Sequence, residues 1–217
     1  MFGRCALTVV AALLLLTGSA LRANSISPGQ SGVTPDVFPY DYNIIWESAA
    51  PSPTFSFDGG LTTFKYVEAV GTDPANPYCS TCLDFAFIFN VTDPNNFITS
   101  VDLSDFAGFA TDGGYTQVGT NPIDPDSVSR STNGSTLDFT YSVGVLPGDH
   151  SALLIVKTNA KNFDYNGVAT LVDNNGASLA LQDFVEPTTA PEPTSAALLG
   201  LGVVVLASFR KKLLRAR

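Results

Sequence analysis

Asn76-Pro-Tyr-Cys-Ser-Thr-Cys-Leu-Asp-Phe-Ala-Phe-Ile-Phe-Asn-Val-Thr92 is the most informative part of the mature chain. Large apolar residues recur there at every second position, which is the side-chain period of a β-strand. One face would carry Leu83, Phe85, Phe87, Phe89 and Val91. The other would carry Asp84, Ala86, Ile88 and Asn90, and we expect it to be about half covered. The pattern predicts a strand with one face fully buried.

Segments of similar character lie on both sides of this strand. We expect a first strand at about 42–47, a hairpin over 55–70 around Asp58-Gly59-Gly60, and a central strand over 152–158. Further strands are predicted near 98–103, 128–131, 137–143 and, as a closing hairpin, 168–181. Asp112-Gly113-Gly114 and residues 121–126 have the composition of turns. About eight or nine short strands, and no helical periodicity between the two termini, predict an all-β, antiparallel β-sandwich, with a jelly roll as the alternative.

The first 23 residues have the layout of a secretory signal. Arg4 gives a positive start, residues 6–16 are apolar, and small residues precede possible cleavage sites after Ala20 or Ala23. We therefore expect residues 1–23 to form a signal helix that the export machinery and a signal peptidase recognise.

The C-terminal segment, residues 191–217, has three parts. Pro191, Glu192 and Pro193 come first, an apolar run over 196–209 follows, and a basic cluster ends the run. That cluster consists of Arg210, Lys211 and Lys212. A run this short fits either a buried helix or a membrane anchor. The basic end, which would remain cytoplasmic, favours a transmembrane helix.

This tripartite segment resembles the PEP-CTERM sorting signal of Gram-negative bacteria. The resemblance implies that a membrane protease, an exosortase, handles the chain. It also implies a protein held transiently in the inner membrane and then located at the cell surface or in the extracellular matrix.

A second resemblance covers residues 78–181. It rests on Cys79-x-x-Cys82-Leu-Asp-Phe, on Asp105-Phe-Ala-Gly-Phe, and on Leu146-Pro-Gly-Asp-His followed by an apolar run. These motifs are similar to the extracellular domain of one group of PEP-CTERM proteins with no assigned activity. The resemblance supports the fold and the location, and it implies no chemistry.

Between the two targeting segments we expect an irregular lead-in (24–53), the sandwich (54–185) and a stalk (186–190). The whole chain has a net charge of −9. Residues 24–190 are more acidic, because their 19 acidic residues face four basic ones, giving −15. The four are Lys65, Arg130, Lys157 and Lys161. This balance disfavours nucleic-acid binding and would attract cations.

Cys79 and Cys82 remain once the signal segment with Cys5 has been removed. In an exported chain an even pair predicts a disulfide. A redox motif is the second possibility, although such motifs precede a helix and here a strand follows. A zinc site is the third, with His150 as the available further ligand. His150 itself lies in a turn, where a solvated side chain is the default.

The sequence carries no recognisable catalytic motif of the serine-hydrolase, metalloprotease or nucleotide-binding type. Two aspartate pairs, Asp102/Asp105 and Asp124/Asp126, are candidates for glycoside hydrolysis. Acidic turns make Asp93, Asp124, Asp126 and Asp173 weak calcium candidates.

Two functional hypotheses follow. The first is a non-enzymatic surface or matrix protein that binds exopolysaccharide, through aromatic residues such as Tyr40, Tyr42 or Trp46; Trp46 is also a core candidate. The second is a glycan hydrolase that acts on the matrix with one aspartate pair.

Overall fold

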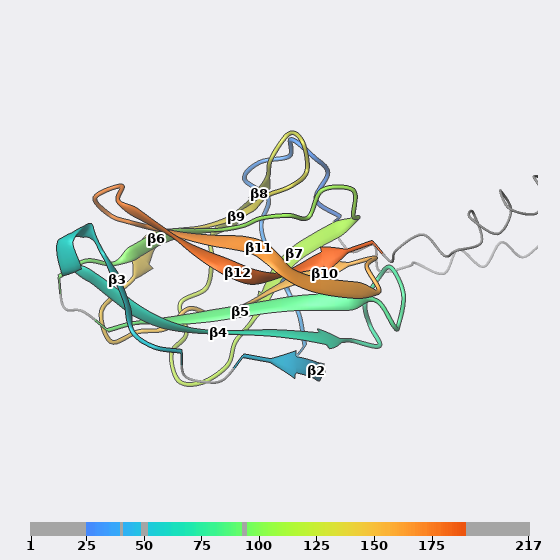
Figure 1. Ribbon diagram of the computed structural model, residues 1–217, viewed down its shortest axis with the longest axis horizontal. Coiled ribbons are helices and arrows are strands. Elements are labelled where there is room, and N and C mark those ends of the chain that lie inside the picture. Colours follow the sequence, from blue (N-terminus) through green and yellow to red (C-terminus); the bar gives the residue numbers. More distant parts are fainter. Residues whose placement is uncertain (1–24, 40, 49–51, 93–94, 190–217) are drawn as a thin grey trace, which may run out of the picture.

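In a computed structural model, residues 25–39, 41–48, 52–92 and 95–189 are described, and they form two packed β-sheets (Figure 1). The larger sheet has the strand order β1-β7-β10-β5-β4-β2, with β3 also paired to β4. Its strands are β1 (Asp36–Val37), β2 (Asn43–Glu47), β3 (Phe55–Phe57), β4 (Thr62–Thr72), β5 (Leu83–Val91), β7 (Thr111–Thr116) and β10 (Leu153–Thr158).

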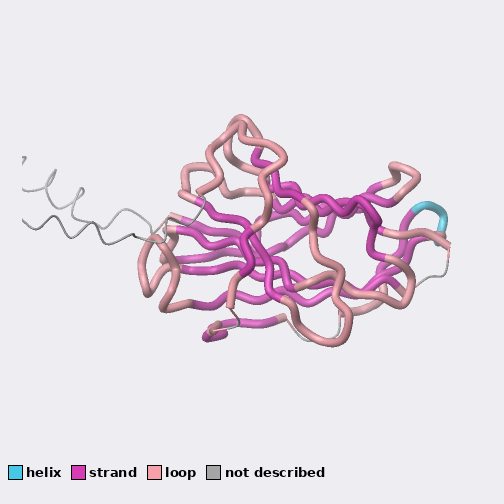
Figure 2. Tube along the Cα trace, turned by 180° about the vertical axis from the view of Figure 1, so that it is seen from behind, coloured by secondary structure: helices cyan, strands magenta, loops and turns pink. Residues whose placement is uncertain are grey.

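The smaller sheet has the order β12-β11-β6-β9-β8. Its strands are β6 (Ile98–Leu103), β8 (Ser127–Arg130), β9 (Leu137–Val145), β11 (Asn162–Asp173) and β12 (Ser178–Thr188). All strand pairs are antiparallel except β1 with β7. The predicted all-β sandwich is confirmed, with more strands than expected. The one helical element of the described residues is the turn η1 (Asp58–Gly60), visible from behind in Figure 2.

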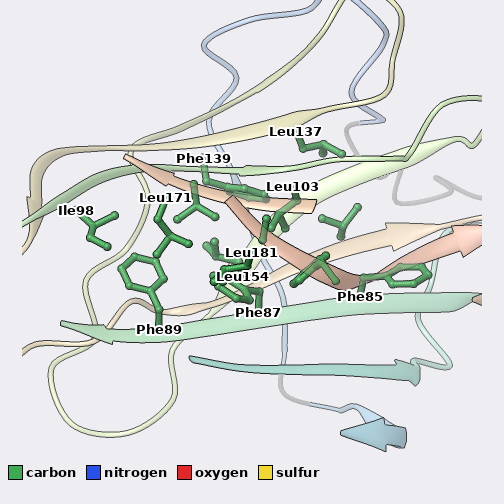
Figure 3. Packing of buried hydrophobic residues seen from close by; sticks show 14 of the residues in the cluster. Phe85, Phe87, Phe89, Ile98, Leu103, Leu137, Phe139, Leu154, Leu171 and Leu181 are labelled. Atoms are coloured by element: carbon green, nitrogen blue, oxygen red, sulfur yellow. The ribbon is translucent and has the colours of Figure 1, made fainter. Parts of the chain in front are cut away.

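The core lies between the sheets, and β5 supplies its centre (Figure 3). Phe85, Phe87 and Phe89 are at most 1 % exposed, because their strand buries every second side chain. Phe87 meets Phe184 of β12 at 5.5 Å between ring centroids, and Phe89 meets Tyr141 of β9 at 6.0 Å. Each such phenylalanine contributes roughly 1.5–3 kcal/mol on burial. The alternation of β5 thus holds the two sheets together.

The other face of β5, on the outside of the sandwich, is partly covered by an N-terminal segment. We call residues 36–43, of which residue 40 is not described, the strap. The strap pairs with β7 at one end, where Asp36 lies opposite Gly114, and with β4 at the other, where Asn43 lies opposite Thr72. Between these points Phe38 packs on Ala69, Ala86 and Ile155, which belong to β4, β5 and β10. The strap therefore crosses the outer face of four strands.

Two glycines make this crossing possible. A Cβ on Gly114 would lie 2.2 Å from the Asp36 carbonyl oxygen, and one on Gly71 would lie 2.6 Å from that of Asn43. We predicted Asp112-Gly113-Gly114 to be a turn, and this is wrong, because the three residues lie inside β7. The glycines serve close approach of a second backbone rather than chain reversal.

The ends of the sandwich differ from expectation in three further places. The predicted lead-in contains β1, which precedes the predicted first strand. Ile26, also in the lead-in, is buried. Residues 186–188 of the predicted stalk belong to β12, where Thr188 pairs with Asn162. Val143, which continues the alternation of apolar residues in the strand predicted at 137–143, is 68 % exposed, because an irregularity in the pairing of β9 with β6 places Val145 in the core instead.

The predicted terminal helices (residues 1–23 and 191–217) lie outside the described residues. Within the described part, no helix is long and apolar enough to cross a membrane.

Candidate functional site

The open part of the larger sheet's outer face, beside the strap, forms a groove. Side chains that alternate outward from β4 and β5 make its floor, since Lys65 lies opposite Asn90 and Val67 opposite Ile88. The larger hollow has a volume of about 510 Å³, and a smaller one of about 140 Å³ adjoins it through shared lining residues. Side chains around the two hollows include Tyr42, Ile44, Glu47, Lys65, Val67, Ile88, Asn90, Val118, His150 and Leu153.

His150 holds one rim of the groove. Its Nε2 lies 2.9 Å from the carbonyl oxygen of Val118. Because a carbonyl oxygen only accepts, Nε2 carries the proton and donates it. Gly119 fits beneath the ring, where any Cβ would come within 2.8 Å of Nε2. His150 is thus half-buried and holds the backbone of residues 118–119 in place. Its turn sequence had predicted a solvated side chain instead.

The same rim is tied to the sheet by backbone hydrogen bonds. The Ile123 N–H donates to the His150 carbonyl at 2.9 Å, and the Ala152 N–H donates to the Ile123 carbonyl at 2.8 Å. The segment from Val118 to Ile123 therefore has a fixed position next to β10 and closes one side of the groove.

Two of the four basic residues between 24 and 190 are removed from the surface by burial. Arg130 is 5 % exposed, and its guanidinium donates to the carbonyls of Ile26, Phe106, Phe109 and Gly134. Lys157 is 2 % exposed and forms an ion pair with Asp73.

Lys65 and Lys161 are left as accessible cations. Lys161 is exposed beyond the end of β10, whereas Lys65 is half-buried in the groove. Lys157–Asp73 is the single ion pair of the described residues, so no carboxylate among them is paired with the Lys65 ammonium. In a domain of net charge −15 the groove therefore holds one of two accessible positive charges.

Under the strap lies a row of buried charges that contrasts with the groove. Lys157 of β10 is flanked in register by Asp84 of β5 and Asp112 of β7. Its Nζ lies 4.3 Å from the centre of the Phe38 ring. Asp84 accepts a hydrogen bond from the Asn76 amide at 2.6 Å, but its other oxygen and both oxygens of Asp112 accept no hydrogen bond.

Burial determines the protonation of this row. It raises the pKa of Asp84 to about 7, an effect that the nearby Lys157 charge only partly offsets. Burial, together with the charge of Asp36, raises the pKa of Asp112 to about 6. The row is thus a structural element that the strap seals from solvent.

Each aspartate of the two predicted pairs has a neighbour outside its pair. Asp102 lies opposite Asp138 on the outer face of the smaller sheet, so the two carboxyl groups are neighbours. Burial and this neighbour raise the pKa of Asp138 to about 6. Carboxyl groups in glycosidases stand about 5–10 Å apart, with the substrate between them.

The remaining members of the predicted pairs and the calcium candidates have other partners, and Asp105 accepts a hydrogen bond from the Ser104 hydroxyl. Asp124 accepts from the Gln117 amide at 2.8 Å, and Asp126 accepts from the Ser142 N–H. Asp173 accepts from Thr62 at 2.8 Å and from the N–H groups of Asn175 and Ala177, so it shapes the β11–β12 turn. Asp93 is outside the described residues. Within the described part, no group of three or more His, Cys, Asp or Glu side chains is placed to hold a metal ion.

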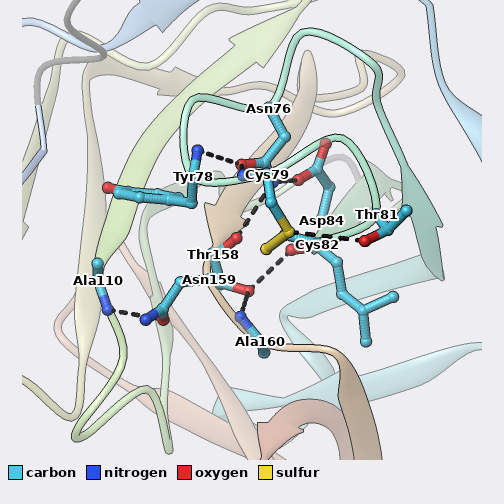
Figure 4. Close-up of a disulfide and its surroundings, with 11 residues drawn as sticks. Asn76, Tyr78, Cys79, Thr81, Cys82, Asp84, Ala110, Thr158, Asn159 and Ala160 are labelled. Atoms are coloured by element: carbon cyan, nitrogen blue, oxygen red, sulfur yellow. Dashed lines mark hydrogen bonds between the residues drawn. A yellow bond between two sulfur atoms is a disulfide. The ribbon is translucent and has the colours of Figure 1, made fainter.

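The structure contains a disulfide between Cys79 and Cys82, at a Cα–Cα distance of 5.1 Å (Figure 4). It closes a short loop before β5, and the Leu83 N–H that follows donates to the Ala160 carbonyl at 2.9 Å. A strand, not a helix, therefore follows the Cys-x-x-Cys sequence. His150, the further zinc ligand considered, lies before the other end of β10.

Of the candidate aromatic residues, Trp46 packs against the core and contacts Tyr165 at 5.2 Å between ring centroids. Tyr42 lines the smaller hollow, and its hydroxyl donates to the Asp84 carbonyl at 2.7 Å. Tyr40 and the sorting residues Pro191, Glu192 and Pro193 lie outside the described residues, as does the basic cluster. Sequence reasoning did not single out Lys65 for a site; the only signal was the scarcity of basic residues.

Comparison with known proteins identifies a PEP-CTERM protein-sorting motif at residues 189–212. The motif marks an exported protein that is transiently anchored through its C-terminal region, and it is the signal that an exosortase recognises. No curated protein sequence matches the chain. One solved structure, an uncharacterized protein from Nocardia farcinica with an immunoglobulin-like fold, is 11 % identical, with a TM-score of 0.29. That match covers 59 % of this chain and 82 % of the other.

Proposed function

We propose that this chain, which carries the PEP-CTERM sorting motif, is a non-enzymatic protein of the cell surface or extracellular matrix that binds exopolysaccharide in its groove. The observation that carries the proposal is the open groove between the strap and the 118–123 rim. It combines an aliphatic floor with a few polar side chains, Lys65 and Asn90 among them. Ligand sites commonly have this composition, with apolar contact area and a small number of orienting polar groups.

The location supports the same ligand class. On the proposed route the protein leaves the inner membrane for the cell surface or the extracellular matrix, where secreted polysaccharide is the expected ligand. The sorting motif and the groove belong to one chain, so the first would deliver the second to its ligand.

A glycan array probed with the full-length protein in detergent tests the proposal, with and without calcium. The calcium arm addresses the acidic turns around Asp124 and Asp126. We expect binding to exopolysaccharide fragments. A Val67→Trp variant should lose it, because the indole would fill the groove floor.

The matched control is Val143→Trp, the same change at a position that is 68 % exposed on the smaller sheet. Equal glycan binding by both variants would mean that the groove is not the binding site. Release of new reducing ends from a bound glycan would instead indicate the hydrolase alternative.

Processing is tested separately by mass spectrometry of the protein from a host that has an exosortase. We expect a mature chain that lacks the segment following Pro191-Glu192-Pro193. Replacement of Glu192 by Ala should leave the protein in the membrane fraction. An intact Arg217 in such a host contradicts the proposed processing.

A further inference from the structure

The floor of the larger hollow contains no aromatic platform for a sugar ring. Tyr66 and Phe89 border it, but both side chains pack into the core between the sheets. The floor is made instead by Val67, Ile88 and Val118. Aliphatic groups give contact area with little selectivity, so selection among sugars has to come from the polar groups of the groove.

Those polar groups are distributed unequally along the groove. Lys65 and Asn90 lie opposite each other, at the end nearest His150. Glu47 lines the other end, in the smaller hollow beside Tyr42. One end of the groove therefore favours a negative group, and the other end disfavours one.

The other basic residues of the domain lie away from the groove. Arg130 and Lys157 are buried, and Lys161 lies beyond the far end of β10. At physiological ionic strength, charges further away than about 8 Å are largely screened. Of the four basic residues of the domain, Lys65 is thus the one placed to contact a ligand in the groove.

We propose that the groove binds sugar units that carry a carboxylate, the class of the uronic acids. The carboxylate accepts hydrogen bonds from the Lys65 ammonium and the Asn90 amide, and the ring lies on Val67 and Ile88. This inference rests on the proposed function and specifies its ligand.

The test compares two probes of equal length and linkage, an oligomer of glucuronic acid and its carboxyl-reduced counterpart. Binding of each to the full-length protein in detergent is measured by calorimetry. We expect the acidic oligomer to bind about tenfold more tightly, as is typical of a hydrogen bond to a charged group.

Three variants locate the effect. Lys65→Met keeps the aliphatic stem and should abolish the preference, whereas Lys65→Arg keeps the charge and should retain it. Lys161→Met makes the same change in net charge at a distance, since β10 alone spans roughly 20 Å at about 3.3 Å per residue. It should bind like the wild type.

Equal binding of the two oligomers, or a preference that survives in Lys65→Met, overturns the inference while exopolysaccharide binding stands. If no glycan of any kind binds, the proposed function fails with it. Loss of preference in both methionine variants would mean that net charge, not the groove, selects the ligand, and this also overturns the inference.

Discussion

The outer face of the larger sheet has two halves with the same strands and opposite properties. In the half under the strap, Lys157 is 2 % exposed, is paired with Asp73 and lies between two buried aspartates. In the open half, Lys65 is half-buried and has no paired carboxylate among the described residues. Lysines on one sheet face thus have different roles, and the difference comes from what crosses the sheet rather than from the strands themselves.

The largest expected effect comes from replacing a lysine by methionine in the covered half, compared with the same replacement in the open half. Lys157→Met leaves Asp73 buried without its partner and should lower the free energy of unfolding by about 3–5 kcal/mol. Lys65→Met should change it by no more than about 0.5 kcal/mol. Urea denaturation at pH 7 measures both, and similar losses would mean that the two halves are energetically alike.

The pH dependence of stability tests the covered half in a second way. The pKa values of Asp84 and Asp112 are raised in the fold, to about 7 and about 6, from about 3.9 in an unfolded chain. Stability from these groups is therefore fully present below about pH 4 and is lost as the pH rises through 6 to 7. We expect a decline on the order of a few kcal/mol, measured by urea denaturation between pH 4 and pH 8.

Glu68, whose pKa burial raises to about 7, adds a decline of the same sign, so variants must separate the contributions. Asp84→Asn should make the decline shallower, because it removes one group that ionises in the interior. Asp41→Asn, at an exposed position in the strap, should leave it unchanged. An unaltered slope in Asp84→Asn contradicts the role given to this carboxyl.

A methyl group added under the strap should have a smaller effect. Gly114→Ala places a carbon 2.2 Å from the Asp36 carbonyl and 2.6 Å from the Phe38 ring, so the strap must shift. We expect a loss of about 1–3 kcal/mol in the free energy of unfolding. Val67→Leu, an enlargement in the open half, should cost no more than about 0.5 kcal/mol. Thermal unfolding followed by circular dichroism distinguishes these outcomes.

The smallest change removes one hydrogen bond of the strap. Tyr42→Phe deletes the hydroxyl that donates to the Asp84 carbonyl and should cost about 1 kcal/mol. Amide hydrogen exchange should increase in the strap and remain unchanged in β11 and β12. Uniformly faster exchange in all strands would indicate that the strap does not open independently of the sandwich.

Local sequence patterns predicted the parts of the fold that depend on neighbouring residues. The alternation of Leu83 to Val91 gave β5 its bounds, and the apolar run of β10 identified a central strand. The strap was not predictable in this way. Gly113 and Gly114 have turn composition, and their actual role depends on Ile26 and Asp36, which lie far away in the sequence.

The candidate site shows the same division. The sequence shows that the domain has only four basic residues, but local sequence could not reveal which two of them would be buried. Lys157 is neutralised by Asp73, 84 positions away, and Arg130 by carbonyls as distant as that of Ile26. Only the assembled sheet leaves Lys65 beside Asn90 and His150 as a possible ligand contact.

The pairing of β12 with β11 reaches Thr188, and this has a mechanical consequence. The sorting match begins at the next residue, so β12 leads directly into the matched segment in the sequence. The described chain also begins at that end, where the Ile26 N–H donates to the Thr111 carbonyl beside the end of β10. Thr188 and Ile26 thus lie at one pole of the sandwich, whereas the groove floor at Ile88 lies roughly 17 Å along β5 from Leu83, which is at that pole. A tether that continues from Thr188 is therefore joined to the sandwich at a distance from the groove.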